Sequence, residues 1–352
     1  MVMAQQAATA PLPPAQGPAE AATDTSRTRG PTLKHSYGAL DLGTNNCRLL
    51  IARPAENGFV VIDAFSRVVR LGEGLATSGR ITDGAIERAL AALSVCADKL
   101  RRRRVSLSRS VATEACRRAV NGRHFVERVY NETGIALEII APEEEARLAM
   151  LGCHRLLEPG DGPALIFDIG GGSTELILIE TDGVQPRIKS WWSAPWGVVS
   201  LTESEGRHFA DPDERLAAYG RMKERVRHAF SRFVESLPAK KENIRLMGTS
   251  GTVTTLASVY LALPSYDRRA VDGLMMPSQA MRDVSHMLSK MSLEERSALP
   301  CIGSERADLV VAGCAILEAI MDIWPAETLG VADRGIREGI LRSLMARDGH
   351  IL

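Results

Sequence analysis

Two segments of this 352-residue chain share one pattern that suits the binding of a phosphate group and a metal ion. Asp41 to Ala52 reads DLGTNNCRLLIA, and Asp168 to Ile179 reads DIGGGSTELILI. In each copy an aspartate stands between apolar residues, a glycine-rich segment follows, and a second apolar run comes after it. Two apolar runs joined in this way predict a β-hairpin whose turn presents backbone N–H groups. Such a turn can hold phosphate oxygens.

The residue types in the two copies suggest separate roles. Carboxylates at strand ends suit magnesium or its water shell, so we expect Asp41 and Asp168 to bind the metal. Glu175 follows the second turn and can order the same waters. Arg48 follows the first turn, at the position that Glu175 takes in the second copy, and can reach the substrate. The expected phosphate cradle consists of Gly43, Thr44, Asn45 and Asn46 in the first copy and Gly170, Gly171, Gly172, Ser173 and Thr174 in the second.

Strands and helices must alternate along the chain to position these residues. The strands predicted from apolar runs lie at 37–42, 47–53, 58–64, 66–71, 108–112, 137–140, 164–169, 174–179 and 244–247. The helices predicted from apolar spacing and start signals lie at 83–104, 114–131, 143–157, 213–236, 278–291, 305–323 and 333–346. This alternation predicts α/β layers.

The repeat predicts two similar lobes that clasp one polyphosphate group from opposite sides. Residues 157–163 (LEPGDGP) form a cluster of helix- and strand-breaking residues and mark the boundary. We expect a first lobe at 34–141, completed by the C-terminal segment 333–352, and a second lobe at 148–330. Residues 1–33 are rich in alanine and proline without hydrophobic periodicity, so a disordered tail is expected there.

Composition narrows the class of protein. The hydrophobic content of 45% and charged content of 24% are typical of a soluble globular protein. A formal net charge of zero provides no overall field that would attract nucleic acid or an acidic membrane, and no apolar stretch is long enough to cross one. The six cysteines show no CxxC spacing, which indicates reduced thiols and a cytoplasmic protein.

Six segments resemble one known family, the exopolyphosphatases and guanosine pentaphosphate (pppGpp) phosphohydrolases. They occur in order across residues 38 to 341 and read ALDLGTNNCRLLIA, SVATEACRRAVN, EIIAPEEEARLAMLG, LIFDIGGGSTELILIE, LMGTSGTVTTLASV and GIREGIL. The resemblance implies the two-lobed fold of the actin-like, sugar-kinase and heat-shock-chaperone superfamily. It also implies Mg²⁺-dependent hydrolysis of the terminal phosphoanhydride of linear polyphosphate. Longer members carry further C-terminal domains, so the chain is similar to the short form.

Site roles follow from the resemblance for several residues. Glu145 matches the catalytic base of the family, although acidic residues in the first turn of a helix can also serve only its dipole. Arg117 matches a phosphate-binding arginine. The family uses carboxylates at the positions of Asp168 and Glu175 for metal and water. Gly251 lies in a turn where nucleotide-using relatives hold adenosine or phosphate, and this turn can also simply cap a helix.

Alternatives remain open at this point. Hydrolysis of pppGpp to the tetraphosphate uses the same kind of terminal phosphoanhydride, so the site residues do not separate the two substrates. An actin-like nucleotide switch or chaperone ATPase is an alternative of another class. The expected partners are polyphosphate or pppGpp, without nucleic acid or membrane, and the sequence leaves a homodimer open.

Overall fold

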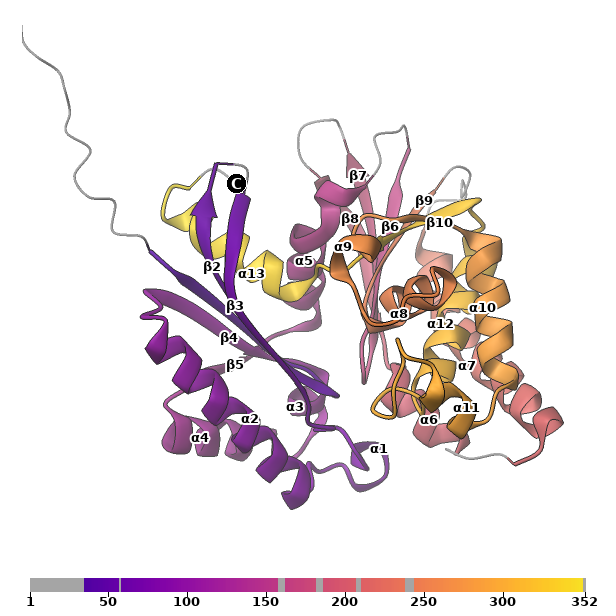
Figure 1. The fold of residues 1–352 in the computed structure, drawn as a ribbon, viewed down its shortest axis with the longest axis horizontal. Helices are drawn as coiled ribbons and strands as arrows, with labels where there is room; N and C mark the ends of the chain where they lie inside the picture. Colours follow the sequence, from indigo (N-terminus) through magenta and orange to yellow (C-terminus); the bar gives the residue numbers. More distant parts are fainter. Residues whose placement is uncertain are drawn as a thin grey trace, which may run out of the picture. The chain divides into compact units, whose positions relative to one another are not determined.

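Each repeated segment forms a hairpin at the centre of its own β-sheet (Figure 1). The computed structural model describes residues 35–56, 58–157, 162–181, 186–206, 210–237 and 244–350. In it, β1 (Tyr37–Leu42) pairs antiparallel with β2 (Asn46–Ala55), and β6 (Ala164–Ile169) pairs in the same way with β7 (Thr174–Thr181). The expected disordered tail at 1–33, and residues 158–161 of the expected boundary, lie outside the described residues.

The two sheets follow the same plan, in which parallel strands extend each hairpin on one side. The first sheet has the order β3-β2-β1-β4-β5 and the second has the order β10-β11-β9-β6-β7-β8. The added strands are β3 (Gly58–Val68), β4 (Leu107–Ala112), β5 (Leu137–Ile139), β8 (Pro186–Ala194), β9 (Arg245–Thr249), β10 (Met275–Pro277) and β11 (Thr328–Ala332). In both sheets the strand beside the hairpin, β4 or β9, runs parallel to the first hairpin strand.

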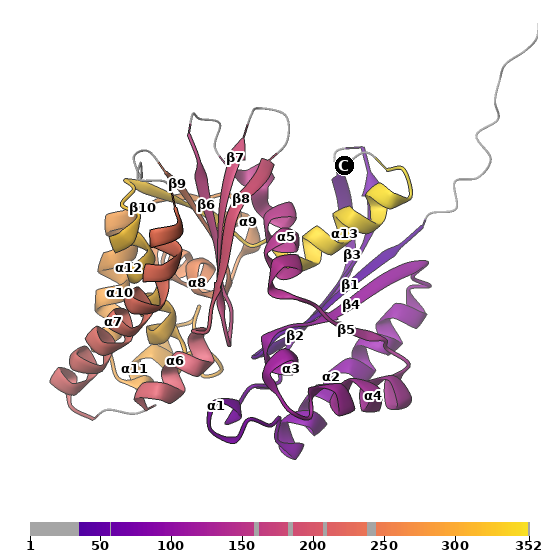
Figure 2. The same ribbon diagram turned by 180° about the vertical axis from the view of Figure 1, so that it is seen from behind.

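Helices cover the faces of both sheets (Figures 1 and 2). In the first half they are α1 (Leu75–Ser78), α2 (Asp83–Arg102), α3 (Glu114–Arg118), α4 (Gly122–Thr133) and α5 (Pro142–Cys153), which ends in a short 3₁₀ turn (His154–Leu156). In the second half they are α6 (Val198–Glu205), α7 (Pro212–Ser236), α8 (Gly251–Tyr260), α9 (Arg268–Val271), α10 (Ser278–Lys290), α11 (Leu293–Ala298), α12 (Val310–Ile323) and α13 (Ile336–Arg347). Among the described helices, every one is too short or too polar to cross a membrane.

Four predicted elements were wrong in detail. The strands expected at 58–64 and 66–71 are one strand, β3, which ends at Val68. The helix expected from Glu114 to 131 is broken into α3 and α4, because the Asn121 side chain bonds the backbone N–H and C=O of Ile81, each at 2.9 Å. The helix expected at 305–323 begins only at Val310.

The alternation of side chains along β1 separates two hydrophobic cores. Leu40 and Leu42 pack with the apolar side of α2. On the opposite face, Tyr37 and Ala39 pack with residues of α5 and α13. The hydroxyl of Tyr37 also donates to Asp348 Oδ2 at 2.6 Å, just beyond the end of α13. The last helix of the chain therefore contacts its first strand, while the limits of the two expected lobes stay a prediction.

Two glycines allow α5 and α13 to cross in backbone contact. A Cβ at Gly152 would lie 2.1 Å from the carbonyl oxygen of Gly335, and a Cβ at Gly339 would lie 2.0 Å from the carbonyl oxygen of Leu148. Both distances are far below van der Waals contact with backbone atoms, which cannot rotate away. Only glycine fits these two positions at the observed helix separation.

Replacing Gly339 with alanine should therefore destabilise the protein, by about 1–3 kcal/mol, because the methyl group forces the two helices apart. Gly220 on α7 is a matched control, since a Cβ there meets nothing within 4 Å. Gly220→Ala should stabilise by about 0.5–1 kcal/mol through helix propensity. Urea unfolding of both variants measures the difference, and equal stability of Gly339→Ala and wild type would contradict the close contact.

Candidate active site

The two hairpin turns have the same hydrogen bond at the same place. The N–H of Gly43 donates to the carbonyl oxygen of Asn46 at 2.9 Å, and the N–H of Gly170 donates to that of Ser173, also at 2.9 Å. The repeat seen in the sequence is thus a repeat of backbone structure.

Strand register places each aspartate opposite a second charged residue. Asp41 on β1 lies opposite Arg48 on β2, and Asp168 on β6 lies opposite Glu175 on β7. The first copy therefore pairs a carboxylate with a cation, whereas the second copy pairs two carboxylates. The side of the site formed by the second hairpin is therefore negative, whereas the side formed by the first hairpin carries charges of both signs.

The second glycine-rich turn packs against the first. A Cβ at Gly171 would lie 2.9 Å from Cβ of Thr44, and a Cβ at Gly172 would lie 2.7 Å from its hydroxyl oxygen. Gly171 and Gly172 are therefore needed for the close approach of the two turns, in addition to any contact with an anion. The arrangement brings both predicted phosphate cradles to one place.

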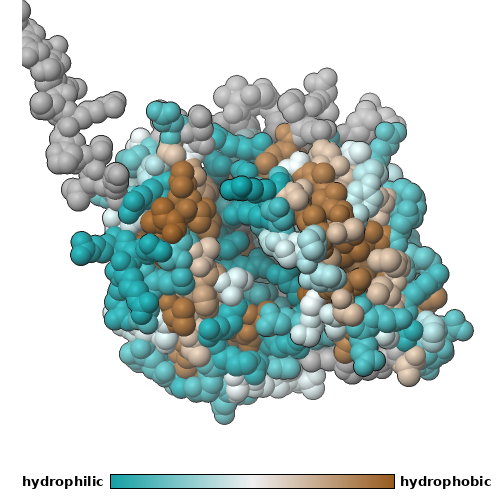
Figure 3. Space-filling model, in the orientation of Figure 1, coloured by the Kyte–Doolittle hydropathy of each residue, from teal (hydrophilic) through white to brown (hydrophobic). Residues whose placement is uncertain are grey.

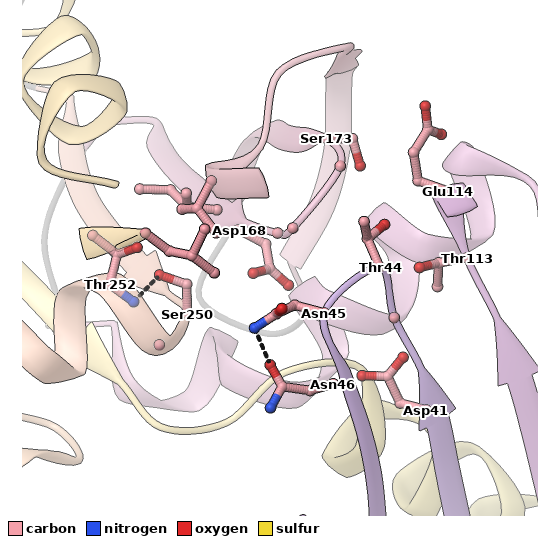
Figure 4. A pocket seen from close by; sticks show the side chains of 18 of the residues that line it. Asp41, Thr44, Asn45, Asn46, Thr113, Glu114, Asp168, Ser173, Ser250 and Thr252 are labelled. Carbon is pink, nitrogen blue, oxygen red and sulfur yellow. Dashed lines mark hydrogen bonds between the residues drawn. The ribbon is translucent and has the colours of Figure 1, made fainter. Parts of the chain in front are cut away.

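A cavity of about 150 Å³ opens where the turns meet (Figure 4). Asp41 and Thr44 reach it from the first hairpin, and Asp168 and Ser173 reach it from the second. On the face shown in Figure 3, hydrophilic residues surround the hollow between the two halves. The predicted site residues that line the cavity are Asp41, Gly43, Thr44, Asn45, Asn46, Arg48, Glu145, Asp168, Gly170, Gly171, Gly172, Ser173, Glu175 and Gly251.

Two predicted phosphate-binding residues do not line this cavity. The Thr174 side chain is fully buried, and its hydroxyl donates to the carbonyl oxygen of Trp196 at 2.7 Å. Arg117 lies behind Glu145, with Nη1 2.7 Å from Glu145 Oε2 and Nη2 2.9 Å from Glu114 Oε2. In this structure Arg117 is thus a partner of carboxylates, and its direct contact with phosphate stays a prediction.

Glu145 stands at the start of α5 and points its carboxylate into the site. It is only 6% exposed, which argues against a role limited to the helix dipole at the surface. Burial raises its pKa well above the ordinary value, and the charge of Glu175 adds to this, while Arg117 opposes it. Among the described residues, Oε1 of Glu145 has no hydrogen-bond partner, so this oxygen is free to contact a water molecule.

Asp41, Asp168 and Glu175 also hold protons more tightly than usual, because burial raises the pKa of each. Burial, with the charges of Glu145 and Asp41, raises the pKa of Asp168 to about 8. The Asp168 side chain is half-buried and lines the cavity. Burial and the charge of Asp168 raise the pKa of Glu175 to about 7, although the hydroxyls of Ser173 and Ser193 donate to it at 2.8 and 2.9 Å.

Three buried oxygen atoms at the first turn have no hydrogen-bond partner within the described part of the chain. They are Asp41 Oδ1, Thr44 Oγ1 and Asn45 Oδ1. Oxygen atoms of this kind are the ligands that magnesium prefers, and the neighbouring carboxylates with raised pKa values need a cation. The residues therefore fit a magnesium ion. Within the described ranges, no three His, Cys, Asp or Glu side chains lie together closely enough to hold a metal ion, so an ion here would need waters or substrate oxygens as further ligands.

Glu114 and Arg337 were missed by sequence reasoning, and Glu114 lines the cavity. Arg306, from the sequence only a weaker candidate for binding phosphate, also lines the cavity, and its Nη1 lies 3.4 Å from the hydroxyl of Thr255. Arg337 lines a smaller adjoining cavity together with Asp41 and Asp168. Both arginines lie far from the hairpins in sequence, so only the fold brings them close. The Ser250 hydroxyl caps α8 beside Gly251, and this cap was foreseen as one possible use of the turn.

The fold and this cavity define a class of protein: a two-lobed α/β protein with a polar cavity where paired hairpin turns meet. The model of the Ppx/GppA phosphatase family matches residues 50–348, and the chain belongs to this family. The family expectation and the expectation of a hydrolase are confirmed.

Individual relatives cover nearly the whole chain. Exopolyphosphatase 2 of Mycobacterium tuberculosis is 30% identical over 319 residues, which are 87% of this chain and 97% of the relative. The crystal structure of the Ppx/GppA family member of Aquifex aeolicus has 30% identity and a TM-score of 0.72, covering 90% of this chain and 99% of its own. An exopolyphosphatase from Cytophaga hutchinsonii has 25% identity and a TM-score of 0.78 with the same coverage. The expected class, two actin-like α/β lobes, is confirmed.

The raised pKa values predict how stability depends on pH without metal. Asp168 and Glu175 keep protons in the folded state up to about pH 8 and 7, whereas the unfolded chain loses them near pH 4. Between these limits the folded state binds more protons, so stability should fall as pH rises, on the order of 1 kcal/mol per pH unit. Thermal unfolding in chelator from pH 5 to 8 measures this, and Asp168→Asn should flatten the slope.

Proposed function

We propose that this protein is a magnesium-dependent exopolyphosphatase that releases terminal orthophosphate from linear polyphosphate. The observation that carries the proposal is one cavity where two glycine-rich turns, five carboxylates and Arg48 meet. Membership of the Ppx/GppA phosphatase family and the names of the Mycobacterium and Cytophaga relatives support the choice of polyphosphate. The pppGpp substrate remains the alternative, because it ends in the same kind of bond.

In this proposal the two turns bind the terminal phosphate. Backbone N–H groups of both turns and the short hydroxyl of Thr44 would contact its oxygens, and Arg48 and Arg306 would compensate its charge. The hydroxyl of Ser173 donates to Glu175 instead. The guanidinium group can donate two hydrogen bonds to a phosphate, which suits this role. Burial lowers the pKa of Arg48, because it disfavours the charged guanidinium group. An anion bound beside Arg48 would stabilise that charge.

In this proposal Asp41, Asp168 and Glu175 line the magnesium site, and they would contact the ion in part through its waters. Asp41 Oδ1 is the carboxylate oxygen that lacks another partner. The bound ion would neutralise charge on the terminal phosphate. The protein residues around it exclude bulk water from the reacting phosphate and fix its orientation.

Glu145 is the proposed general base. Arg117 holds one of its oxygens at 2.7 Å and so orients the carboxylate, while the other oxygen takes a proton from water. The water oxygen attacks the terminal phosphorus, the phosphoanhydride bond breaks, and the shortened chain leaves with the electron pair. A base with a raised pKa accepts this proton near neutral pH more readily than an ordinary glutamate.

The location and assembly of the enzyme belong to the same proposal. All six cysteines are free thiols, and five of them are buried. This state suits a reducing compartment, so we infer a cytoplasmic location. A homodimer is compatible with the sequence and awaits a measurement of molar mass in solution.

Removing the base should abolish turnover and leave binding intact. Glu145→Gln keeps the size of the side chain and should lower kcat by at least about 100-fold, the usual scale of general-base catalysis. Polyphosphate affinity should change little, since the turns and arginines bind the phosphate. Glu143→Gln is the matched control, because Glu143 precedes Glu145 by two positions in the same helical turn and its side chain is exposed. Near-normal kcat in Glu145→Gln would assign the base elsewhere.

Magnesium should act on both activity and stability. Phosphate release from polyphosphate should stop in excess chelator and return with added Mg²⁺. Independently of activity, Mg²⁺ should raise the melting temperature of the wild type at pH 8, and raise that of Asp168→Asn less. Unchanged melting temperatures would argue against metal binding at these carboxylates.

Parallel assays with polyphosphate, pppGpp and ATP decide the substrate, and hydrolysis of pppGpp alone would overturn the choice of polyphosphate.

A further inference from the structure

A second cavity of about 260 Å³ lies among the helices of the second half. It is bounded by α6, α7, α10, α11 and the start of α12, which gather on one side of the second sheet (Figure 1). Among the described residues, none lines both this cavity and the candidate active site. The cavity is therefore a separate place in the molecule.

A buried arginine without a counter-ion lines this cavity. Arg296 on α11 is only 6% exposed, and its Nε has no hydrogen-bond partner. Its guanidinium group makes no hydrogen bond or ion pair with any residue in the described ranges. Arginines are almost never buried unless they are paired, because the charge loses its hydration. An anionic ligand would supply the missing partner.

A second positive charge lies at the same cavity. Arg215 on α7 lines it, and its charge acts on Arg296. The first turn of α12 lies along the cavity through Val311 and Ala312, and the N-terminus of a helix carries partial positive charge.

One carboxylate in the cavity restricts the kind of anion. Asp308 binds Arg70 Nη1 through Oδ2 at 3.0 Å, while its Oδ1 is buried and has no hydrogen-bond partner. A ligand that satisfies both Arg296 and this oxygen must carry negative oxygens and also a hydroxyl that can donate. Hydrogen phosphate has both, whereas sulfate at neutral pH has no proton to donate.

We propose that this cavity binds one inorganic phosphate ion, with Arg296 donating to its oxygens and Asp308 Oδ1 accepting from its hydroxyl. Phosphate binding in this cavity requires no catalysis, so the proposal does not rest on the proposed function.

Equilibrium dialysis with radiolabelled inorganic phosphate tests the site on the full chain. Arg296→Met should bind one phosphate fewer per chain than the wild type. Arg48→Gln, which changes only the candidate active site, should retain the phosphate that Arg296→Met loses. Arg227→Met replaces an exposed arginine of α7 that pairs with Glu224, and it should bind as the wild type does. Equal binding by Arg296→Met and wild type, or no binding by the wild type up to about 10 mM phosphate, would overturn the proposal.

Competition with sulfate tests the part played by Asp308. Sulfate should displace phosphate from this site at least about tenfold less well than phosphate itself, because it leaves Asp308 Oδ1 facing an anion. Asp308→Asn should remove this preference, since an amide can donate to sulfate. Equal competition in the wild type would overturn the proposal. Arg296→Met should melt no lower than the wild type without phosphate, because it removes an unpaired buried charge, and this separates lost binding from misfolding.

Discussion

The gathering of carboxylates around one cavity is the constraint on which the rest of the site depends, and four of the five are provided by the two hairpins and α5. Asp41, Glu145, Asp168 and Glu175 come from β1, α5, β6 and β7, so both sheets and a helix must meet to bring them together. Like charges that are partly removed from water repel one another strongly. The protein compensates with Arg117 against Glu145, with two serine hydroxyls on Glu175, and with protons retained to higher pH than usual. A bound cation could therefore replace the protons that these carboxylates keep.

Local pattern was sufficient to predict the hairpins and most of the site. The alternation of apolar residues around Asp41 and Asp168 set the strand register. The helix predicted from residue 83 begins there as α2, and Thr82 caps it. These features depend on residues close together in the chain. Glu145 was found only through family resemblance, because three consecutive glutamates at a helix start do not differ in local pattern. Burial distinguishes them, since Glu143 is exposed and Glu145 is enclosed.

Features that depend on distant contacts could not be read from the sequence. The break between α3 and α4 coincides with the hydrogen bonds of Asn121 to residue 81, 40 residues earlier in the sequence. Arg306 was only a weaker candidate from its sequence and Arg337 was given no role, because only the fold brings their segments to the site. The same limit applies to Gly171 and Gly172, which looked like a flexible anion cradle and also prove to be spacers for Thr44.

The contact of α13 with β1 has a consequence for how the chain folds during synthesis. Tyr37 and Ala39 share a core with Ile340 and Leu344, so the cover of their face of the first sheet is incomplete until α13 has been made. Leu40 and Leu42, on the other face, pack with α2, which follows within about sixty residues. One face of the same strand can therefore be buried early, and the other is fully covered only after α13 has been made. Contacts between such distant residues slow folding, and the apolar face that waits for them is open to aggregation in the meantime.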